Sequence, residues 1–172
     1  MQEINDMQYK EAIDTLYKDS RNDLVGTTIE LFFYFAMYLL IVISASFSDT
    51  ESKMKVIVIL VSSIFFVCLV AYFVRVIVYT KYDFDKLKNG ECQVIKGIIV
   101  KVNRKHMQTT TFWYDIKNCD TGEISDFYIV NHYHQGTELK TTETPYTFYY
   151  TEKNKATCCP ELDKELAKNN NK

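Results

Sequence analysis

Two apolar stretches decide the fold: residues 31–47, LFFYFAMYLLIVISASF, and residues 56–74, VIVILVSSIFFVCLVAYFV. Neither stretch contains a charged residue, and a short polar loop joins them. A helix needs about 20 apolar residues to cross a bilayer, with a working range of about 17–25. We therefore predict a transmembrane helical hairpin whose spans cover residues 29–48 and 55–79.

The overall composition conceals this membrane character. The chain of 172 residues has a net charge of −2 and 24% charged residues, as an ordinary soluble domain would. The charges gather in the flanks of the two stretches, and the roughly 90 residues after the second stretch are enough for one small domain. The acidic start of the chain lacks the pattern of a cleaved signal peptide, so we expect the first stretch to be an uncleaved anchor.

Lysine and arginine are more frequent on the outer flanks of the hairpin than in its connecting loop. The flanks hold Lys10, Lys18, Arg21, Arg75, Lys81, Lys86 and Lys88, and the loop holds Lys53 and Lys55. The positive-inside rule then predicts an integral, multi-pass protein with both termini in the cytoplasm. The five cysteines show no disulfide spacing, and free thiols fit a reducing compartment.

The short loop requires the two helices to be antiparallel neighbours. This register places Ala36 level with Cys68, which favours close helix packing in lipid through small residues. It also places Glu30 level with Arg75 at the membrane edge. We predict an ion pair between them, and the alternative is that each side chain extends separately to the headgroups.

The segment before the hairpin, residues 1–27, is acidic and has a loose helical rhythm. Its expected apolar face consists of Ile4, Met7, Ile13, Leu16 and Tyr17. We expect this segment to pack on the C-terminal domain or on a partner, or to fray. A helix break is expected at residues 26–28, Gly-Thr-Thr, with a threonine as the cap of the next helix.

After residue 81 the apolar pattern becomes alternating, which is typical of β-strands. A first strand carries Gly97 at a bulge or kink. Residues 112–117 and 124–130 then form a hairpin around the turn cluster 118–122. Further short strands are predicted over residues 138–141 and 146–151.

The predicted fold class is a membrane α + β protein, in which the helical hairpin (residues 28–80) is followed by a small antiparallel β-barrel or sandwich (residues 81–160). The strand layout is similar to that of OB-like and SH3-like domains, without a motif that identifies a family. Residues 161–172 are expected to form a short helix and a disordered tail.

The candidate chemistry is sparse. His132 and His134 lie two apart on an expected strand, so both imidazoles could reach one metal ion, but we favour a solvated turn over a metal site. Cys158 and Cys159 are adjacent, which fits neither zinc-ligand spacing nor juxtamembrane lipidation, and we interpret them as surface thiols. No catalytic motif and no cofactor-binding motif is present, so we expect no enzyme and no cofactor.

The partners predicted from the sequence are a lipid bilayer and a protein. Residues 81–172 carry about as many acids as bases, which argues against nucleic-acid binding. Six aromatic residues supply the predicted protein-binding surface: Phe112, Trp113, Tyr114, Phe148, Tyr149 and Tyr150. The leading hypothesis is a membrane-anchored accessory protein whose β-domain binds a partner or modulates a membrane complex. The alternative is a subunit of an oligomeric channel or transporter, with a homo-oligomer as one possible form.

Overall fold

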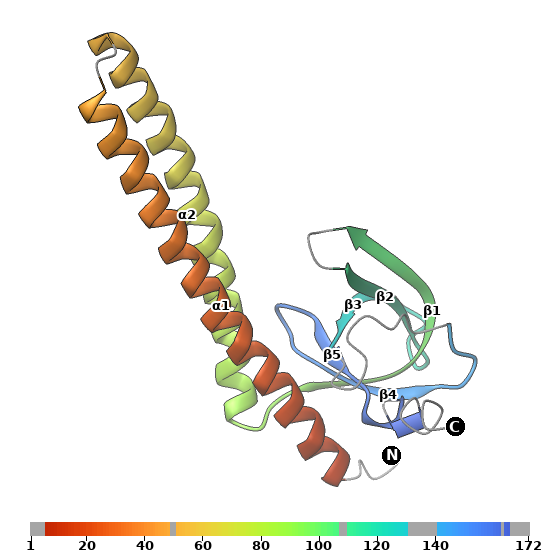
Figure 1. Ribbon diagram of the computed structural model, residues 1–172. Coiled ribbons are helices and arrows are strands. Elements are labelled where there is room, and N and C mark those ends of the chain that lie inside the picture. The colour runs from red at the N-terminus through yellow and green to blue at the C-terminus, as the bar shows by residue number, and fades with distance from the viewer. Residues whose placement is uncertain (1–5, 49–50, 107–109, 131–140, 163, 166–172) are drawn as a thin grey trace. The chain divides into compact units, whose positions relative to one another are not determined.

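The computed structural model describes residues 6–48, 51–106, 110–130, 141–162 and 164–165, with the backbone alone described at residues 104–106 and 110–112. The chain divides into two compact units. The hairpin unit consists of residues 21–81. The barrel unit combines the chain up to Ser20 with the chain from Tyr82 onward. Figure 1 shows the helices and strands of both units.

Two long helices contribute to both units. Helix α1 runs from Asp6 to Phe47, and helix α2 runs from Ser52 to Lys88. The predicted break at residues 26–28 is wrong, because α1 is continuous there. The Thr28 hydroxyl donates to the Leu24 carbonyl at 2.7 Å, four residues back in the same helix, instead of capping a new helix.

The hairpin unit has the predicted antiparallel arrangement. Tyr38 of α1 stacks on Phe66 of α2, with ring centroids 4.4 Å apart, and its hydroxyl lies 2.9 Å from the Ser63 hydroxyl. Near the loop, Lys55 donates to the Ser46 carbonyl at 3.4 Å. These contacts lie within a few residues of the predicted register. Both helices are long and apolar enough to cross a membrane by length and composition.

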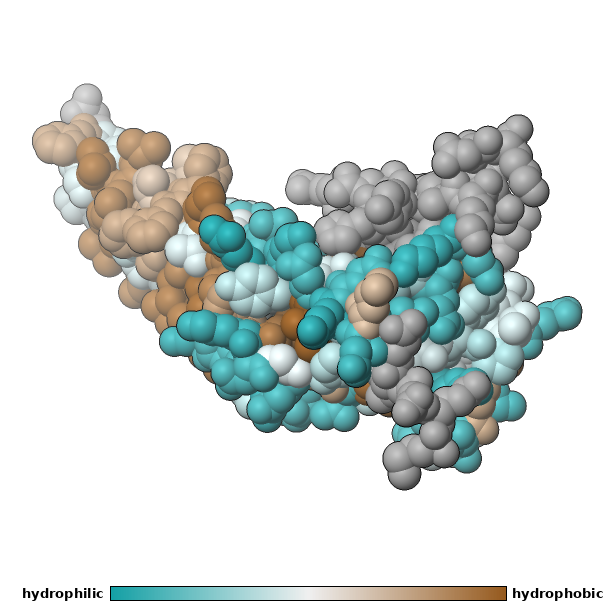
Figure 2. All heavy atoms as spheres, turned by 90° about the horizontal axis from the view of Figure 1, so that it is seen from below, coloured by the Kyte–Doolittle hydropathy of each residue, from teal (hydrophilic) through white to brown (hydrophobic). Residues whose placement is uncertain are grey.

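Apolar side chains of the hairpin face outward. Within the most apolar 18-residue window of each helix, 0% of the α1 residues and 6% of the α2 residues are buried. Figure 2 shows hydrophobic residues gathered over the helical hairpin, whereas hydrophilic residues dominate the rest of the visible face.

The C-terminal domain is a closed five-stranded barrel, so the predicted barrel forms and the alternative sandwich does not. Its strands are β1 (Gln93–His106), β2 (Thr110–Asn118), β3 (Ile124–Ile129), β4 (Tyr146–Tyr150) and β5 (Ala156–Cys158). The strand order around the barrel is β1-β2-β3-β5-β4, and β1 closes it by pairing with both β2 and β4. The predicted strand at residues 138–141 lies almost entirely outside the described residues.

One strand pair departs from the predicted antiparallel pattern. β3 and β5 are parallel, with Tyr128 opposite Ala156, whereas the other four pairs are antiparallel. The reason is parity: strand directions cannot alternate all the way around a closed ring of five strands. At least one neighbouring pair has to be parallel, and the three-residue strand β5 supplies it.

Gly97 allows β1 to change partners. It lies opposite Tyr146 of β4 on one side and Asn118 of β2 on the other. A Cβ atom there would lie 2.6 Å from Ile116 Cγ2 and 2.8 Å from the Lys117 carbonyl oxygen, so only glycine fits without a shift. The pairing irregularity predicted at Gly97 lies slightly further on, where the register shifts between Ile99 and Lys101.

Two buried clusters form the core of the barrel unit. The first fills the barrel and contains Ile95, Ile99, Tyr114, Ile116, Phe127, Ile129, Phe148, Cys159 and Leu162. The second lies between the barrel and the helices, and contains Ala12, Leu16, Leu87, Val130, Tyr149, Ala156 and Cys158. Of the three alternatives expected for the first helical segment, packing on the C-terminal domain is the one that the structure shows.

The helix face that makes this contact matches the predicted one in part, because the predicted residues Leu16 and Tyr17 belong to it or pack against it. Ala12 and Leu16 are fully buried, but Met7 is 73% exposed. The small side chain of Ala12 permits close approach to the barrel, and Leu16 supplies the apolar area. Beyond β5, residues 160–162 and 164–165 are helical, in agreement with the predicted short helix.

Candidate functional site

The main polar feature of the barrel unit is a buried carboxylate on α2. Asp83 is 1% exposed. Its two oxygens accept hydrogen bonds from the backbone N–H groups of Lys153 at 3.0 Å and Asn154 at 2.8 Å. A buried charge is costly unless it is fully hydrogen-bonded. Here each oxygen has a backbone donor, so the end of α2 is attached to the turn between β4 and β5.

The turn that binds Asp83 is shaped for this contact. The Thr151 backbone N–H donates to the Ala156 carbonyl at 2.8 Å, and the Ala156 N–H donates to the Thr151 hydroxyl at 3.1 Å. Lys155 has a positive φ of 52°. This left-handed residue directly follows the two residues whose N–H groups bind the carboxylate.

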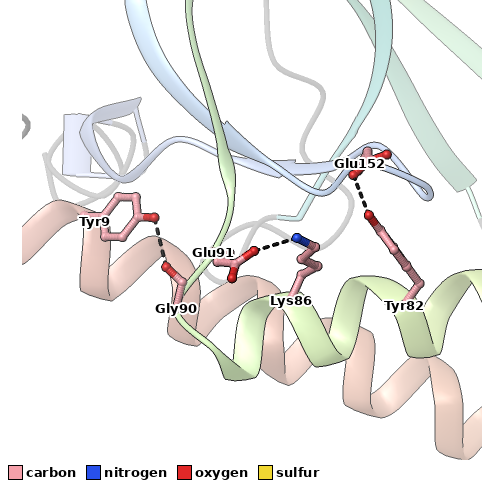
Figure 3. A network of polar contacts seen from close by, with 6 residues as sticks. All are labelled: Tyr9, Tyr82, Lys86, Gly90, Glu91 and Glu152. Carbon is pink, nitrogen blue, oxygen red and sulfur yellow. Dashed lines mark hydrogen bonds and ion pairs between the residues drawn. The ribbon is translucent and has the colours of Figure 1, made fainter.

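Exposed polar contacts involve the neighbouring residues Tyr82 and Glu152, which Figure 3 shows pointing toward each other. The Tyr82 hydroxyl donates to Glu152 at 2.9 Å, and Lys153 lies 3.3 Å from Glu152 and 5.3 Å from the centre of the Tyr82 ring. The hydrogen bond lowers the pKa of the Glu152 carboxyl and raises the pKa of the Tyr82 hydroxyl. These contacts are exposed, so they orient side chains and contribute little stability.

Two more contacts join the end of α2 to its neighbours, as Figure 3 also shows. Lys86 pairs with Glu91 at 2.6 Å, and the hydrogen bond raises the pKa of the Lys86 ammonium. The Tyr9 hydroxyl of α1 donates to the Gly90 carbonyl at 2.9 Å. Gly90 has a φ of 77°, which suits the residue that follows a helix C-terminus.

A small polar cavity lies beside these contacts. It is lined by Asp83, Lys86, Leu87, Glu91, Cys92, Gln93, Tyr150, Thr151 and Glu152, and its volume is about 50 Å³. This volume suits one or two water molecules and is far below the ~300 Å³ of a typical ligand pocket. The junction therefore has the properties of a structural attachment and not those of a substrate site.

The cysteines occupy different positions from those predicted. Cys158 and Cys159 are each 1% exposed, so the interpretation as surface thiols is wrong. Cys158 belongs to β5 and donates from its thiol to the Ala12 carbonyl at 3.6 Å. Cys92 is half-buried, and burial raises the pKa of its thiol, which disfavours a reactive thiolate. Cys119 is exposed in the turn after β2.

The other predicted site residues are not brought together. His132 and His134 lie outside the described residues, and no cluster of three metal-ligating side chains exists within the described part of the chain. In the hairpin unit, as far as it is described, no ion pair joins Glu30 to Arg75. The Arg75 guanidinium lies 5.3 Å from the centre of the Tyr79 ring. The pairing of the two charges stays a prediction.

The predicted aromatic surface is largely interior. Tyr114, Phe148 and Tyr149 are 3%, 0% and 1% exposed. Tyr114 and Phe148 face the barrel core, whereas Tyr149 lies on the opposite face of β4 and packs in the cluster between the barrel and the helices. The Phe112 side chain is not described. Trp113 is half-buried on the outer face of β2 and lies opposite Tyr128 of β3, with ring centroids 6.1 Å apart.

Of the two residues in this outward-facing aromatic pair, the sequence predicted Trp113 and missed Tyr128. Strand alternation identified Trp113, but its partner depended on the register of the hairpin. Polar side chains lie beside this pair on the same face. Lys101 of β1 lies opposite Asp115 of β2, and the Asn103 side chain donates a hydrogen bond to the Asp115 carboxylate at 2.8 Å. The face carries both signs of charge and an apolar centre.

Comparisons with known proteins provide no identification of this chain. No protein family matches it, and neither a curated protein nor a solved structure is significantly similar to it.

Proposed function

We propose that this chain is a membrane-anchored accessory protein without enzymatic activity, whose barrel unit binds a partner protein or modulates a membrane complex. In this proposal the hairpin spans the bilayer and both termini are cytoplasmic. The observation that carries the membrane anchor is the outward-facing apolar surface of both helices. Exposing apolar area to water costs about 25 cal/mol per Å², which a lipid environment removes.

The binding role is supported by the outer face of β2 and β3. Tryptophan and tyrosine are enriched where proteins bind each other, because their rings supply apolar area at low entropic cost. Trp113 and Tyr128 form such a pair, and the exposed Ile124 lies on the same hairpin. The mixed charges around them favour a protein over a nucleic acid, which would require a predominantly basic face.

We also propose that the barrel is OB-like. Three features support this assignment: the strand order, the parallel β3–β5 pair, and a long first strand that is shared between two partners. OB-like barrels commonly bind ligands on the face that includes strands 2 and 3. The aromatic pair lies on those two strands.

The membrane assignment is tested by extraction and labelling. The protein should stay with membranes in alkaline carbonate. An impermeant maleimide should label exposed Cys119 only after the cells are permeabilised, and a Cys119→Ser variant provides the control for the remaining thiols. Release by carbonate would contradict the membrane anchor, and labelling in intact cells would reverse the proposed orientation.

The binding role is tested by affinity capture from native membranes with matched variants. Trp113→Ala and Tyr128→Ala should each reduce a captured partner about tenfold or more, as expected for central aromatic contacts. Lys88→Ala, an exposed change at the end of α2 and away from β2 and β3, should leave capture unchanged. Equal capture by all variants would exclude the outer face of β2 and β3 as the partner-binding surface. A defined homo-oligomer with ion conductance would instead support the alternative of a channel or transporter subunit.

A further inference from the structure

A groove lies between α1 and α2 at the loop end of the hairpin unit. Its volume is about 470 Å³. It is lined by Met37, Leu40, Ile41, Ser44 and Ala45 from α1, by Ser48 directly after α1, and by Met54, Lys55 and Val58 from α2. The lining is apolar along most of its length and becomes polar toward the loop.

The groove has the length of one membrane leaflet. From Met37 to Phe47, where α1 ends just before the groove residue Ser48, the helix rises about 15 Å, at 1.5 Å per residue. The hydrocarbon core of a bilayer is about 30 Å thick, so one leaflet contributes about 15 Å. A groove of this length, open along one side of the hairpin, matches an acyl chain that runs from the membrane surface to the bilayer centre.

A lysine lies at the polar end of the groove. Lys55 lines it, and its ammonium donates to the Ser46 carbonyl at 3.4 Å. An ammonium carries three N–H donors, and this hydrogen bond uses one of them. A phosphate is the anion that a membrane supplies at this depth, and lysine binds phosphate as a point charge.

We propose that this groove binds a phospholipid, with one acyl chain between the helices and the phosphate at Lys55. This proposal rests on the proposed membrane function. A second groove, lined by Ile57, Val58, Val61, Ser62 and Phe65, is comparably large, but no charged residue lines it. We therefore expect that second groove to show no headgroup preference.

The test uses the full chain in vesicles of phosphatidylcholine and phosphatidylglycerol. A trace of phosphatidylglycerol carries a photoreactive diazirine in the middle of one acyl chain, and crosslinks are mapped by mass spectrometry of peptides. Crosslinks should concentrate on the groove residues of α1 and α2. Uniform labelling around both helices would overturn the proposal, as would an absence of lipid crosslinks at the groove residues.

Two matched pairs of variants separate the headgroup from the acyl chain. Lys55→Gln should lower the crosslink yield about fivefold, the loss expected for one charge-assisted hydrogen bond in a wet site. Lys53→Gln, at a lysine in the first turn of α2 that does not line the groove, should have no effect. Ala45→Trp should abolish the groove crosslinks by filling the space. Ile43→Trp, at a residue 51% exposed on the same helix and outside the groove, should not.

The proposed membrane function has a separate readout in the same samples. If carbonate releases the chain from the vesicles, the membrane assignment itself fails. If the chain stays in the vesicles and Lys55→Gln and Ala45→Trp crosslink like the unaltered chain, only the phospholipid site fails.

Discussion

Asp83 and Asn154 are 71 residues apart in the sequence, and the Asn154 backbone N–H donates a hydrogen bond of 2.8 Å to the Asp83 carboxylate. This contact, together with the matching one from Lys153, attaches α2 to the turn between β4 and β5. The barrel unit therefore includes the last turns of α2 as a structural part, and its stability should depend on one buried carboxylate.

The first prediction concerns this carboxylate. Asp83→Ala should lower the free energy of unfolding of the barrel unit by about 3 kcal/mol, because two backbone donors lose a charged acceptor. Asp83→Asn should cost less, since its carbonyl oxygen still accepts one bond. Thermal unfolding of the purified full chain in mild detergent measures both. Asp85→Ala, at an exposed position two residues later, is the control, and an equal loss in that variant would contradict the role of Asp83.

The second prediction concerns the close approach at Gly97. Gly97→Ala should destabilise the barrel by about 2 kcal/mol, because the new methyl group would overlap Ile116 and the Lys117 carbonyl. Gly26→Ala is the matched control: nothing lies within 4 Å of a Cβ there, and alanine in a helix interior should stabilise by about 0.5–1 kcal/mol. The melting temperature should fall in the Gly97→Ala variant and rise in the Gly26→Ala variant. A neutral Gly97→Ala would show that β1 can move away from β2.

The third prediction is a loss of stability in alkali. Burial raises the pKa of Tyr149 to about 12, and a hydrogen bond to Glu165 raises the pKa of Tyr146 to about 12. In the unfolded chain a tyrosine titrates near 10, so between about pH 10 and 12 the unfolded state releases protons that the folded state keeps. The stabilisation is complete below pH 10 and is lost as the pH rises toward 12.

Melting temperatures between pH 8 and 12 measure this alkaline loss. Tyr149→Phe should reduce it, because phenylalanine has no proton to release. Tyr150→Phe, the next residue of β4, is the control for removing a hydroxyl from the same strand. An unchanged pH profile in Tyr149→Phe would show that Tyr149 does not contribute to the alkaline transition.

The fourth prediction concerns the two charges at the edge of the apolar helices. If Glu30 and Arg75 pair in the membrane, Arg75→Glu should destabilise the hairpin by up to about 1 kcal/mol through the loss of attraction and the gain of repulsion. The double variant Glu30→Arg, Arg75→Glu should restore the original stability. Unfolding in lipid-like detergent measures all three proteins, and a double variant no more stable than the single one would exclude the pair.

Local patterns in the sequence were sufficient for the helices and for most strands. A stretch without charges and a two-residue alternation each reveal an element without reference to the rest of the chain. The hairpin register also followed from the sequence, because a short loop leaves few ways to align two helices. The break at residues 26–28 was mispredicted because glycine and threonine are tolerated inside a long helix, where Thr28 bonds to the preceding turn.

The candidate sites depended on contacts between distant residues. Nothing near Asp83 in the sequence distinguishes it from the exposed Asp85, and only its position against the β4–β5 turn buries it. Cys158 and Cys159 were interpreted as surface thiols, because the three-residue strand β5 is too short to show a strand pattern in the sequence. Its stability comes from pairing between β3 and β4.

The sequence by itself determined the two apolar helices, their antiparallel hairpin and a β-rich domain after them, because each rests on neighbours along the chain. The tertiary structure alone decided how the barrel closes, which aromatic residues face outward, and that both α1 and α2 belong to the barrel unit. The physical reason is that burial, strand partners and the pairing of a buried charge arise from residues that meet only in the folded chain.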